Sequence, residues 1–150
     1  MSAKPDWWTS DHWATPPNLV RELALEFGPF DLDPCCHAET AKAPKFYTPE
    51  DDGLTQPWSG KVFMNPPYSD VSPWLQKAFA ETQNGGAEVV VALLPACTDT
   101  GWFHTLVQGR AEIRFLRGRV RFFGWMETPI SSPKSPSMLA IYRRNVHGKF

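Results

Sequence analysis

The chain has 150 residues, of which 42% are hydrophobic and 13% aromatic, and its formal net charge is −1. This length and composition allow one domain with a buried core, and they exclude a disordered tail, a collagen-like fibre and a coiled coil. The longest apolar run, Val89–Leu94, is much shorter than the roughly 20 residues of a membrane-spanning helix, and the first residues lack a signal peptide's apolar segment.

The chain has three cysteines, Cys35, Cys36 and Cys97. Their number is odd and two of them are adjacent, which argues against a secreted disulfide framework. They also lack the paired Cys-x-x-Cys spacing of a zinc site, so no bound metal is expected. We therefore expect a soluble, cytoplasmic protein that makes no contact with a membrane.

Hydrophobic spacing predicts three helices. Apolar residues recur at helical spacing after two proline-containing starts, with Thr15 and Ser72 as the expected N-caps and Pro16 and Pro73 at the first helical positions. The expected helices cover residues 16–27, 72–83 and 100–108.

Seven short segments have the alternation or the continuous apolar character of strands. In chain order they are residues 30–33, 45–48, 61–64, 88–94, 113–116, 120–123 and 137–142. The expected strand 88–94 is apolar without interruption from Val89 to Leu94, which is typical of a parallel strand buried on both faces. Segments 113–116 and 120–123 flank a turn and predict an antiparallel hairpin. The fold class is therefore α/β, a mostly parallel sheet with an antiparallel edge hairpin, in a single domain over residues 1–150.

Polar and proline residues directly follow three of the expected strands: Asp33-Pro34, Asn65-Pro66-Pro67-Tyr68 and Pro95-Ala96. Ligands of such folds bind beyond the carboxyl ends of the strands, so these segments are expected to line one edge of the sheet.

The tetrapeptide Asn65-Pro66-Pro67-Tyr68 has a structural and a chemical interpretation. It can be a rigid turn, because its prolines donate no backbone hydrogen bonds and end the strand. It can also hold a planar group that carries an exocyclic amine. For that group Asn65 and Pro66 offer acceptor oxygens, and Tyr68 offers a flat face for stacking.

With its flanking residues, this tetrapeptide resembles a known family. The ordered motifs are Trp13-x-Thr15-Pro16, Phe30-Asp31-Leu32-Asp33-Pro34, Phe46-Tyr47-Thr48, Asp52-Gly53-Leu54, Trp58 and Met64-Asn65-Pro66-Pro67-Tyr68-Ser69. From Trp7 to Tyr142 the chain resembles S-adenosylmethionine-dependent amino methyltransferases, and more narrowly the small phage-encoded DNA N6-adenine methyltransferases, the Dam family of phages. The resemblance implies a Rossmann-like fold reduced in size, one catalytic domain with no separate target-recognition domain, and a phage or prophage gene expressed in a bacterial host.

The resemblance also implies a reaction, methyl transfer from S-adenosylmethionine to the N6 amine of adenine in DNA. Asn65, Pro66, Pro67 and Tyr68 would form the catalytic motif. The Asn65 oxygen and the Pro66 carbonyl would accept the two amine hydrogens, which returns electron density to the nitrogen. Tyr68 would stack on an adenine flipped out of the duplex. The transfer would be a direct in-line displacement that depends on positioning and preorganised dipoles.

Cofactor contacts follow from the same resemblance. Asp33 would pair with the α-amino group or oppose the sulfonium of S-adenosylmethionine, although it could instead cap the next turn. Asp51 and Asp52 are candidates for the ribose or the adenine of the cofactor, or form a solvated acidic turn. Many relatives have a glycine-rich loop after this strand, whereas residues 35–39 of this chain include no glycine. The full expected set is Trp13, Thr15, Pro16, Asp31, Asp33, Pro34 and Asp52.

Charge is divided unevenly along the chain. Residues 1–100 carry 6 Lys/Arg and 14 Asp/Glu, whereas residues 101–150 carry 9 and 2. The excess of basic residues in 101–150 has two explanations, contact with an anionic partner such as DNA or an ordinary solvated surface. The expected DNA contacts are Arg117, Arg119 and Arg121, which would alternate onto one face of a strand, and Lys134. The sequence leaves the oligomeric state open between a monomer and a homodimer.

Two other functions remain open from the sequence. The same tetrapeptide could serve a methyltransferase that acts on a glutamine amide or an RNA base. The fold could also serve a nucleic-acid-binding module without catalysis, because the loop after Asp33 is poor in glycine.

Overall fold

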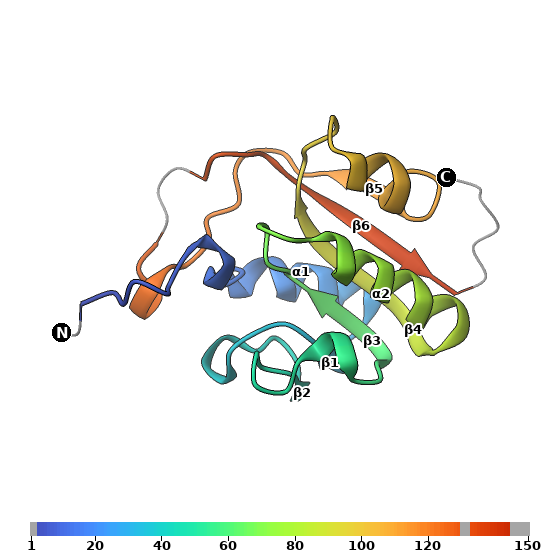
Figure 1. Ribbon diagram of the computed structural model, residues 1–150, viewed down its shortest axis with the longest axis horizontal. Helices are drawn as coiled ribbons and strands as arrows, with labels where there is room; N and C mark the ends of the chain where they lie inside the picture. The colour runs from blue at the N-terminus through green and yellow to red at the C-terminus, as the bar shows by residue number, and fades with distance from the viewer. Residues whose placement is uncertain (1–2, 130–132, 145–150) are drawn as a thin grey trace.

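The computed structural model describes residues 3–129 and 133–144, and a six-stranded sheet forms its centre (Figure 1). The strands are β1 (Leu32–Asp33), β2 (Lys45–Phe46), β3 (Ser59–Met64), β4 (Gly86–Pro95), β5 (Glu112–Phe115) and β6 (Ser137–Arg143). Their order in the sheet is β2-β1-β3-β4-β6-β5. Pairing is parallel from β2 to β4 and antiparallel at β4–β6 and β5–β6. This is the mostly parallel α/β sheet with antiparallel edge strands that the sequence predicts.

Two helices, α1 (Pro17–Phe27) and α2 (Ser72–Asn84), cover opposite faces of the sheet (Figure 1). Alternate residues of β4 divide between these two faces. Val89, Val91 and Leu93 pack with α1, and Val90, Ala92 and Leu94 pack with α2. Both sets are buried, which is the reason that residues 89–94 of this strand are apolar throughout.

Short helical turns complete the fold. They are η1 (Ser10–His12), η2 (Ala38–Thr40), η3 (Gly53–Thr55), η4 (Phe103–Val107, π-helical) and η5 (Trp125–Glu127). The η4 turn lies within the third expected helix. Among the described residues, no helix has both the length and the apolar composition needed to cross a bilayer.

Both expected N-caps are wrong. Helix α1 begins at Pro17, one residue later than expected, and Pro16 occupies the N-cap position with an extended ψ of 133°. A residue that precedes a proline is sterically disfavoured in the α conformation, so the Pro16-Pro17 pair delays the helix. Helix α2 includes Ser72 as its first residue, and Val71 takes the N-cap position without a side-chain hydrogen bond.

The expected hairpin between 113–116 and 120–123 is also wrong. Strand β5 lies at the sheet edge as predicted, but it pairs with β6. Residues 120–122 lie outside any strand, and Phe123 makes only isolated bridges to Ala14 and Pro129. Val120 and Phe122 are buried in the core cluster under α1. Their alternation therefore reflects packing against the face of the sheet, and Arg117, Arg119 and Arg121 do not share the face of a strand.

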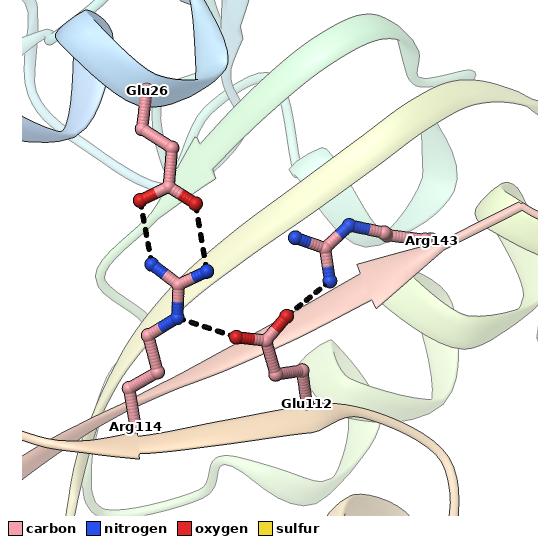
Figure 2. A network of polar contacts seen from close by, with 4 residues as sticks. All are labelled: Glu26, Glu112, Arg114 and Arg143. Carbon is pink, nitrogen blue, oxygen red and sulfur yellow. Dashed lines mark hydrogen bonds and ion pairs between the residues drawn. The ribbon is translucent and has the colours of Figure 1, made fainter. Parts of the chain in front are cut away.

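A network of four charged side chains joins α1 to the antiparallel part of the sheet (Figure 2). The guanidinium of Arg114 donates two hydrogen bonds to Glu26, of 2.6 and 2.7 Å, and a third to Glu112. Arg143 donates to the other oxygen of Glu112. Arg143 pairs with Val89 near the amino end of β4, so this network lies at the opposite end of the sheet from the carboxyl ends of β1 and β3.

Candidate active site

The carboxyl ends of β1, β2 and β3 border a cavity of about 360 Å³. Residues expected from the sequence that line it are Trp13, Thr15, Asp33, Pro34, Asp52, Asn65 and Pro67. Expected residues that are not in its lining are Pro16, Asp31, Pro66 and Tyr68. Most of the expected cofactor and catalytic residues therefore surround one opening at the edge where α/β folds bind their ligands.

Asp33 ends β1 and is almost fully buried, with 3% of its surface exposed. Its two carboxylate oxygens accept hydrogen bonds from the backbone N–H groups of Cys35 and Lys42, at 3.4 and 3.0 Å. Burial raises the pKa of the Asp33 carboxyl to about 7, and these hydrogen bonds offset part of that rise. Asp33 thus shapes the loop that follows β1 and also presents a carboxyl group to the cavity.

The close approach of two loops depends on Gly53. A Cβ atom at this position would overlap the carbonyl oxygen of Pro34. The carbonyl of Gly53 also accepts a 2.8 Å hydrogen bond from the buried indole of Trp58. The glycine that lets the backbone pack tightly beside the end of β1 therefore comes from the loop after β2, although the residues directly after Asp33 include none.

The two neighbouring acidic residues Asp51 and Asp52 differ in their roles. The Asp51 carboxylate accepts hydrogen bonds from the N–H and hydroxyl of Thr48, at 2.8 and 3.0 Å, and so closes its own turn. Asp52 lines the cavity, has a left-handed backbone with φ of 55°, and accepts one hydrogen bond from the N–H of Leu54. Asp52 is thus the member of the pair placed to meet a ligand.

Asp31 lies away from the cavity. Its carboxylate accepts a 2.8 Å hydrogen bond from the N–H of Lys61 and packs against Gly60, where β3 has an irregular register with β4. The side chain therefore joins the starts of β1 and β3 instead of facing a ligand at their carboxyl ends.

Asn65 follows directly after β3 and lines the cavity. Its side-chain Nδ2 donates a 3.1 Å hydrogen bond to the carbonyl oxygen of Trp13. A carbonyl oxygen can only accept, so this contact turns the nitrogen of the amide toward Trp13 and leaves Oδ1 as the atom that can accept from a ligand.

The two members of the motif that do not line the cavity are Pro66 and Tyr68. Pro66 is buried. The hydroxyl of Tyr68 donates a 3.2 Å hydrogen bond to the carbonyl of Leu93 in β4, and its ring contacts Phe122 edge to face. Burial raises the pKa of Tyr68 well above its ordinary value. Tyr68 therefore anchors the motif to the central strand and keeps only part of its ring exposed.

Sequence reasoning did not single out Asp11, His12 or His37, which all line the cavity. His12 Nδ1 and His37 Nε2 are 2.8 Å apart, and Trp8 stacks against both imidazoles. Burial lowers the pKa of His12, and the charge of His37 lowers it further. The only available signal for this part of the site was the aromatic character of residues 7–13.

The expected DNA contacts lie outside the cavity. Arg117, Arg119, Arg121 and Lys134 are all exposed, and they belong to the two segments that flank residues 130–132 on either side. Arg119 donates a 3.5 Å hydrogen bond to the carbonyl of Pro133, so the two segments are in contact.

A family model described as DNA N-6-adenine-methyltransferase (Dam) matches residues 3–148. The chain belongs to this family. A DNA N-6-adenine-methyltransferase of Haemophilus phage HP1 is 33% identical over 137 residues, which cover 88% of this chain and 78% of the relative. That of Escherichia phage T1 is 35% identical over 106 residues, covering 69% of this chain and 43% of the relative. The chain thus matches less than half the length of the phage T1 relative.

Two further similarities agree with this placement. A putative methyltransferase of Escherichia coli, YfdM, is 39% identical over 71 residues, which cover 43% of this chain and 74% of that protein. The crystal structure of a putative RNA methyltransferase from Pyrococcus horikoshii superposes with a TM-score of 0.56 at 15% identity, and the match covers 93% of this chain and 89% of that one. The structural match establishes a Rossmann-like methyltransferase fold.

A methyltransferase requires a methyl donor, and the cavity fits a cationic one. Asp33 and Asp52 contribute carboxyl groups from the ends of β1 and the loop after β2, and Asn65 contributes an acceptor oxygen. Trp74, at the start of α2, adds an aromatic surface to the same lining. Carboxylates and aromatic rings are the groups that bind cations and planar rings in proteins.

Proposed function

We propose that this protein transfers a methyl group from S-adenosylmethionine to the exocyclic N6 amine of adenine in DNA. The observation that carries the proposal is the Asn65 amide, which lines the cavity and is turned by Trp13 so that Oδ1 can accept a hydrogen bond. Membership of the Dam family supports DNA and adenine as the substrate class.

Asn65 and Pro66 act on the amine in this proposal. The amine of adenine is a poor nucleophile because its lone pair is delocalised into the ring. Hydrogen bonds from its two hydrogens to Asn65 Oδ1 and to the Pro66 carbonyl localise electron density on the nitrogen, and fixed acceptors need no reorganisation during the reaction. Pro67 keeps the direction of the Pro66 carbonyl fixed. S-adenosylmethionine, when bound, would supply an electrophilic methyl group on a sulfonium for direct in-line displacement. The methyl carbon would exchange its bond to sulfur for a bond to N6, a neutral thioether would leave, and the amine would release one proton to solvent.

Adenine has to leave the duplex before it can reach these groups. We propose that the exposed part of the Tyr68 ring stacks on the flipped base, while its hydroxyl stays bound to Leu93. The main role of Tyr68 is then to hold the motif rigidly against β4.

The lining residues divide the work of holding the cofactor. Asp33 would face the positively charged part of the cofactor and Asp52 its hydroxyl-bearing part. Trp13, Thr15 and Pro34, which line the same cavity, would complete the wall. With a pKa of about 7, Asp33 is readily ionised by a nearby cation, so binding of the cofactor would release a proton from this carboxyl.

DNA would contact Arg117, Arg119, Arg121 and Lys134 through its phosphates. A homodimer would extend this basic surface, and sedimentation with and without DNA would detect it. We place the reaction in the cytoplasm of a bacterial host, where the phage relatives' DNA is found.

The test is to offer the purified protein S-adenosylmethionine carrying a labelled methyl group, together with DNA, RNA and protein in separate reactions. After nucleoside digestion, the proposal expects label in N6-methyladenine from DNA. Label in RNA or in a glutamine side chain would contradict the substrate. Calorimetric titration with S-adenosylmethionine is the companion measurement, and absence of binding heat would indicate a module without catalysis.

A further inference from the structure

The segment that precedes α1 contacts both the catalytic motif and Ser69, the residue that follows it. Trp13 accepts the hydrogen bond from Asn65 Nδ2, as described above. Two residues earlier, Asp11 accepts a 2.9 Å hydrogen bond from the N–H of Ser69 and a second from the Ser69 hydroxyl. Residues 11–13 and 65–69 are 52 to 58 positions apart in the chain, so these contacts set the relative position of two distant segments.

The backbone on either side of the Trp13 carbonyl is held by two sets of contacts. Trp13 follows the single 3₁₀ turn of η1, and its N–H donates a 3.2 Å hydrogen bond to Ser10. Ala14 is fixed by two backbone hydrogen bonds to Phe123, at 2.8 and 3.0 Å. On the other side, the Asp11 carboxylate is the side-chain link between η1 and the motif. Hydrogen bonds to a carboxylate are stronger than those between neutral groups. The link from Asp11 is therefore well suited to hold the short η1 turn against Ser69.

We propose that Asp11 is a positioning residue for the Asn65 amide, acting through Ser69 and the Trp13 carbonyl. The inference rests on the proposed function, because it assigns Asn65 Oδ1 to the substrate amine. Both carboxylate oxygens of Asp11 are bound by Ser69, and Asp11 is only partly exposed at the cavity. Its role is therefore to set the direction in which Asn65 presents its oxygen, and it needs no contact with the cofactor.

Three substitutions separate positioning from cofactor binding. Asp11→Ala removes both acceptor oxygens, and a small displacement of a reacting group is enough to lower kcat by about 10- to 100-fold. Ser69→Ala removes the hydroxyl and keeps the N–H donor, so its loss should be smaller. Asp11→Asn keeps one acceptor oxygen for Ser69 without the charge, so it should recover part of the activity. In all three variants the KM for DNA and the Kd for S-adenosylmethionine should stay unchanged.

Asp70→Ala is the matched control, because it removes a carboxylate from the next residue of the same loop. Asp70 is exposed, and among the described residues its side chain has no hydrogen bond or ion pair. This variant should keep the kcat of the unmodified protein.

The direct readout is the side-chain NH₂ signal of Asn65 in ¹⁵N–¹H spectra, assigned by its loss in Asn65→Ala. The proton that donates to Trp13 should resonate downfield of its position in a free asparagine side chain, and this downfield displacement should disappear in Asp11→Ala. An unchanged Asn65 signal in Asp11→Ala overturns the inference. So does weaker S-adenosylmethionine binding in Asp11→Ala together with an unaffected Ser69→Ala variant, since that pattern makes Asp11 a cofactor ligand.

This readout does not require turnover. A protein that methylates no DNA but loses the downfield displacement of the Asn65 proton in Asp11→Ala would contradict the proposed function and still support the positioning role of Asp11.

Discussion

The side-chain nitrogen of Asn65 lies 3.1 Å from the carbonyl oxygen of Trp13, to which it donates a hydrogen bond. This contact accounts for an amide, and not a carboxylate, at position 65. A carboxylate at position 65 would place a second acceptor against the Trp13 carbonyl. The two oxygens would repel each other unless the carboxyl group were protonated and could donate.

Two substitutions at Asn65 should therefore behave differently. Asn65→Ala should lower methyl transfer by about 100- to 1000-fold at every pH, because a preorganised hydrogen-bonding group is lost. Asn65→Asp should retain most activity at low pH, where a protonated carboxyl can donate to Trp13, and should lose it as the pH rises. The rates are measured from pH 5 to 9, with circular dichroism to verify the fold. An Asn65→Asp variant whose activity is insensitive to pH would contradict the role given to Trp13.

Gly53 should be essential for stability. A Cβ atom there would overlap the backbone oxygen of Pro34, which cannot move without displacing the end of β1. Gly53→Ala should thus lower the free energy of unfolding by about 1–3 kcal/mol, as overpacking does in other cores. Gly101→Ala is the matched control, because nothing lies within 4 Å of a Cβ at that position. Equal stabilities of the two variants in urea denaturation would refute the argument.

The fold was largely predictable because the sequence of β4 identifies it as a strand buried on both faces. Continuous apolar character over residues 89–94 requires two covered faces, and two helical patterns were available to cover them. The edge was harder to predict. Val120 and Phe122 alternate with arginines as strand residues do, but they are buried against the face of the sheet under α1. Periodicity reports that one side is buried, and it does not distinguish a paired strand from an extended segment that lies on a sheet.

The site was predictable where the backbone ends a strand, as at Asp33 and Asn65, since strand ends meet at one edge. It was not predictable where a contact joins distant segments. Nothing in the local sequence of Asp11 or His37 indicates that they face the same cavity as Asn65. Asp31 shows the opposite difficulty, since it lies two positions before Asp33 and yet binds the backbone of Lys61.

Asp33 should make the folded protein less stable as the pH rises from about 4 to about 7. Its pKa of about 7 in the folded protein exceeds its ordinary value of 3.8, so the folded state binds more protons than the unfolded state between these values. The free energy of unfolding contributed by this group therefore falls as the pH rises from about 4 to about 7 and is constant above that. Asp33→Asn removes the ionisation, so the variant should gain stability relative to the unmodified protein over this range. Urea denaturation at several pH values measures the difference, and parallel curves would contradict the burial argument.

The network in Figure 2 should show the opposite pH dependence. Hydrogen bonds from Arg114 and Arg143 hold the pKa of Glu112 below its ordinary value. The stability that Glu112 contributes is thus present above the ordinary pKa of a glutamate and is lost as the pH falls through the lowered value. Glu112→Gln should lower the Tm at pH 7, and the difference from the unmodified protein should shrink in acid. The exposed Glu22→Gln on α1 serves as the control and should change the Tm little at either pH.

The basic segments should determine the salt dependence of DNA binding. Each lysine or arginine that contacts a phosphate contributes about one unit to the slope of log K against log salt concentration. Arg117→Ala, Arg119→Ala and Lys134→Ala should each reduce the slope by about this amount on any DNA sequence. Arg21→Ala, an exposed arginine of α1, is the matched control and should leave the slope unchanged. Because these arginines do not share a strand face, we expect each single variant to reduce the salt slope independently of the others. Fluorescence anisotropy over a range of salt concentrations provides the slopes, and an equal reduction by Arg21→Ala would show that the DNA contacts lie elsewhere.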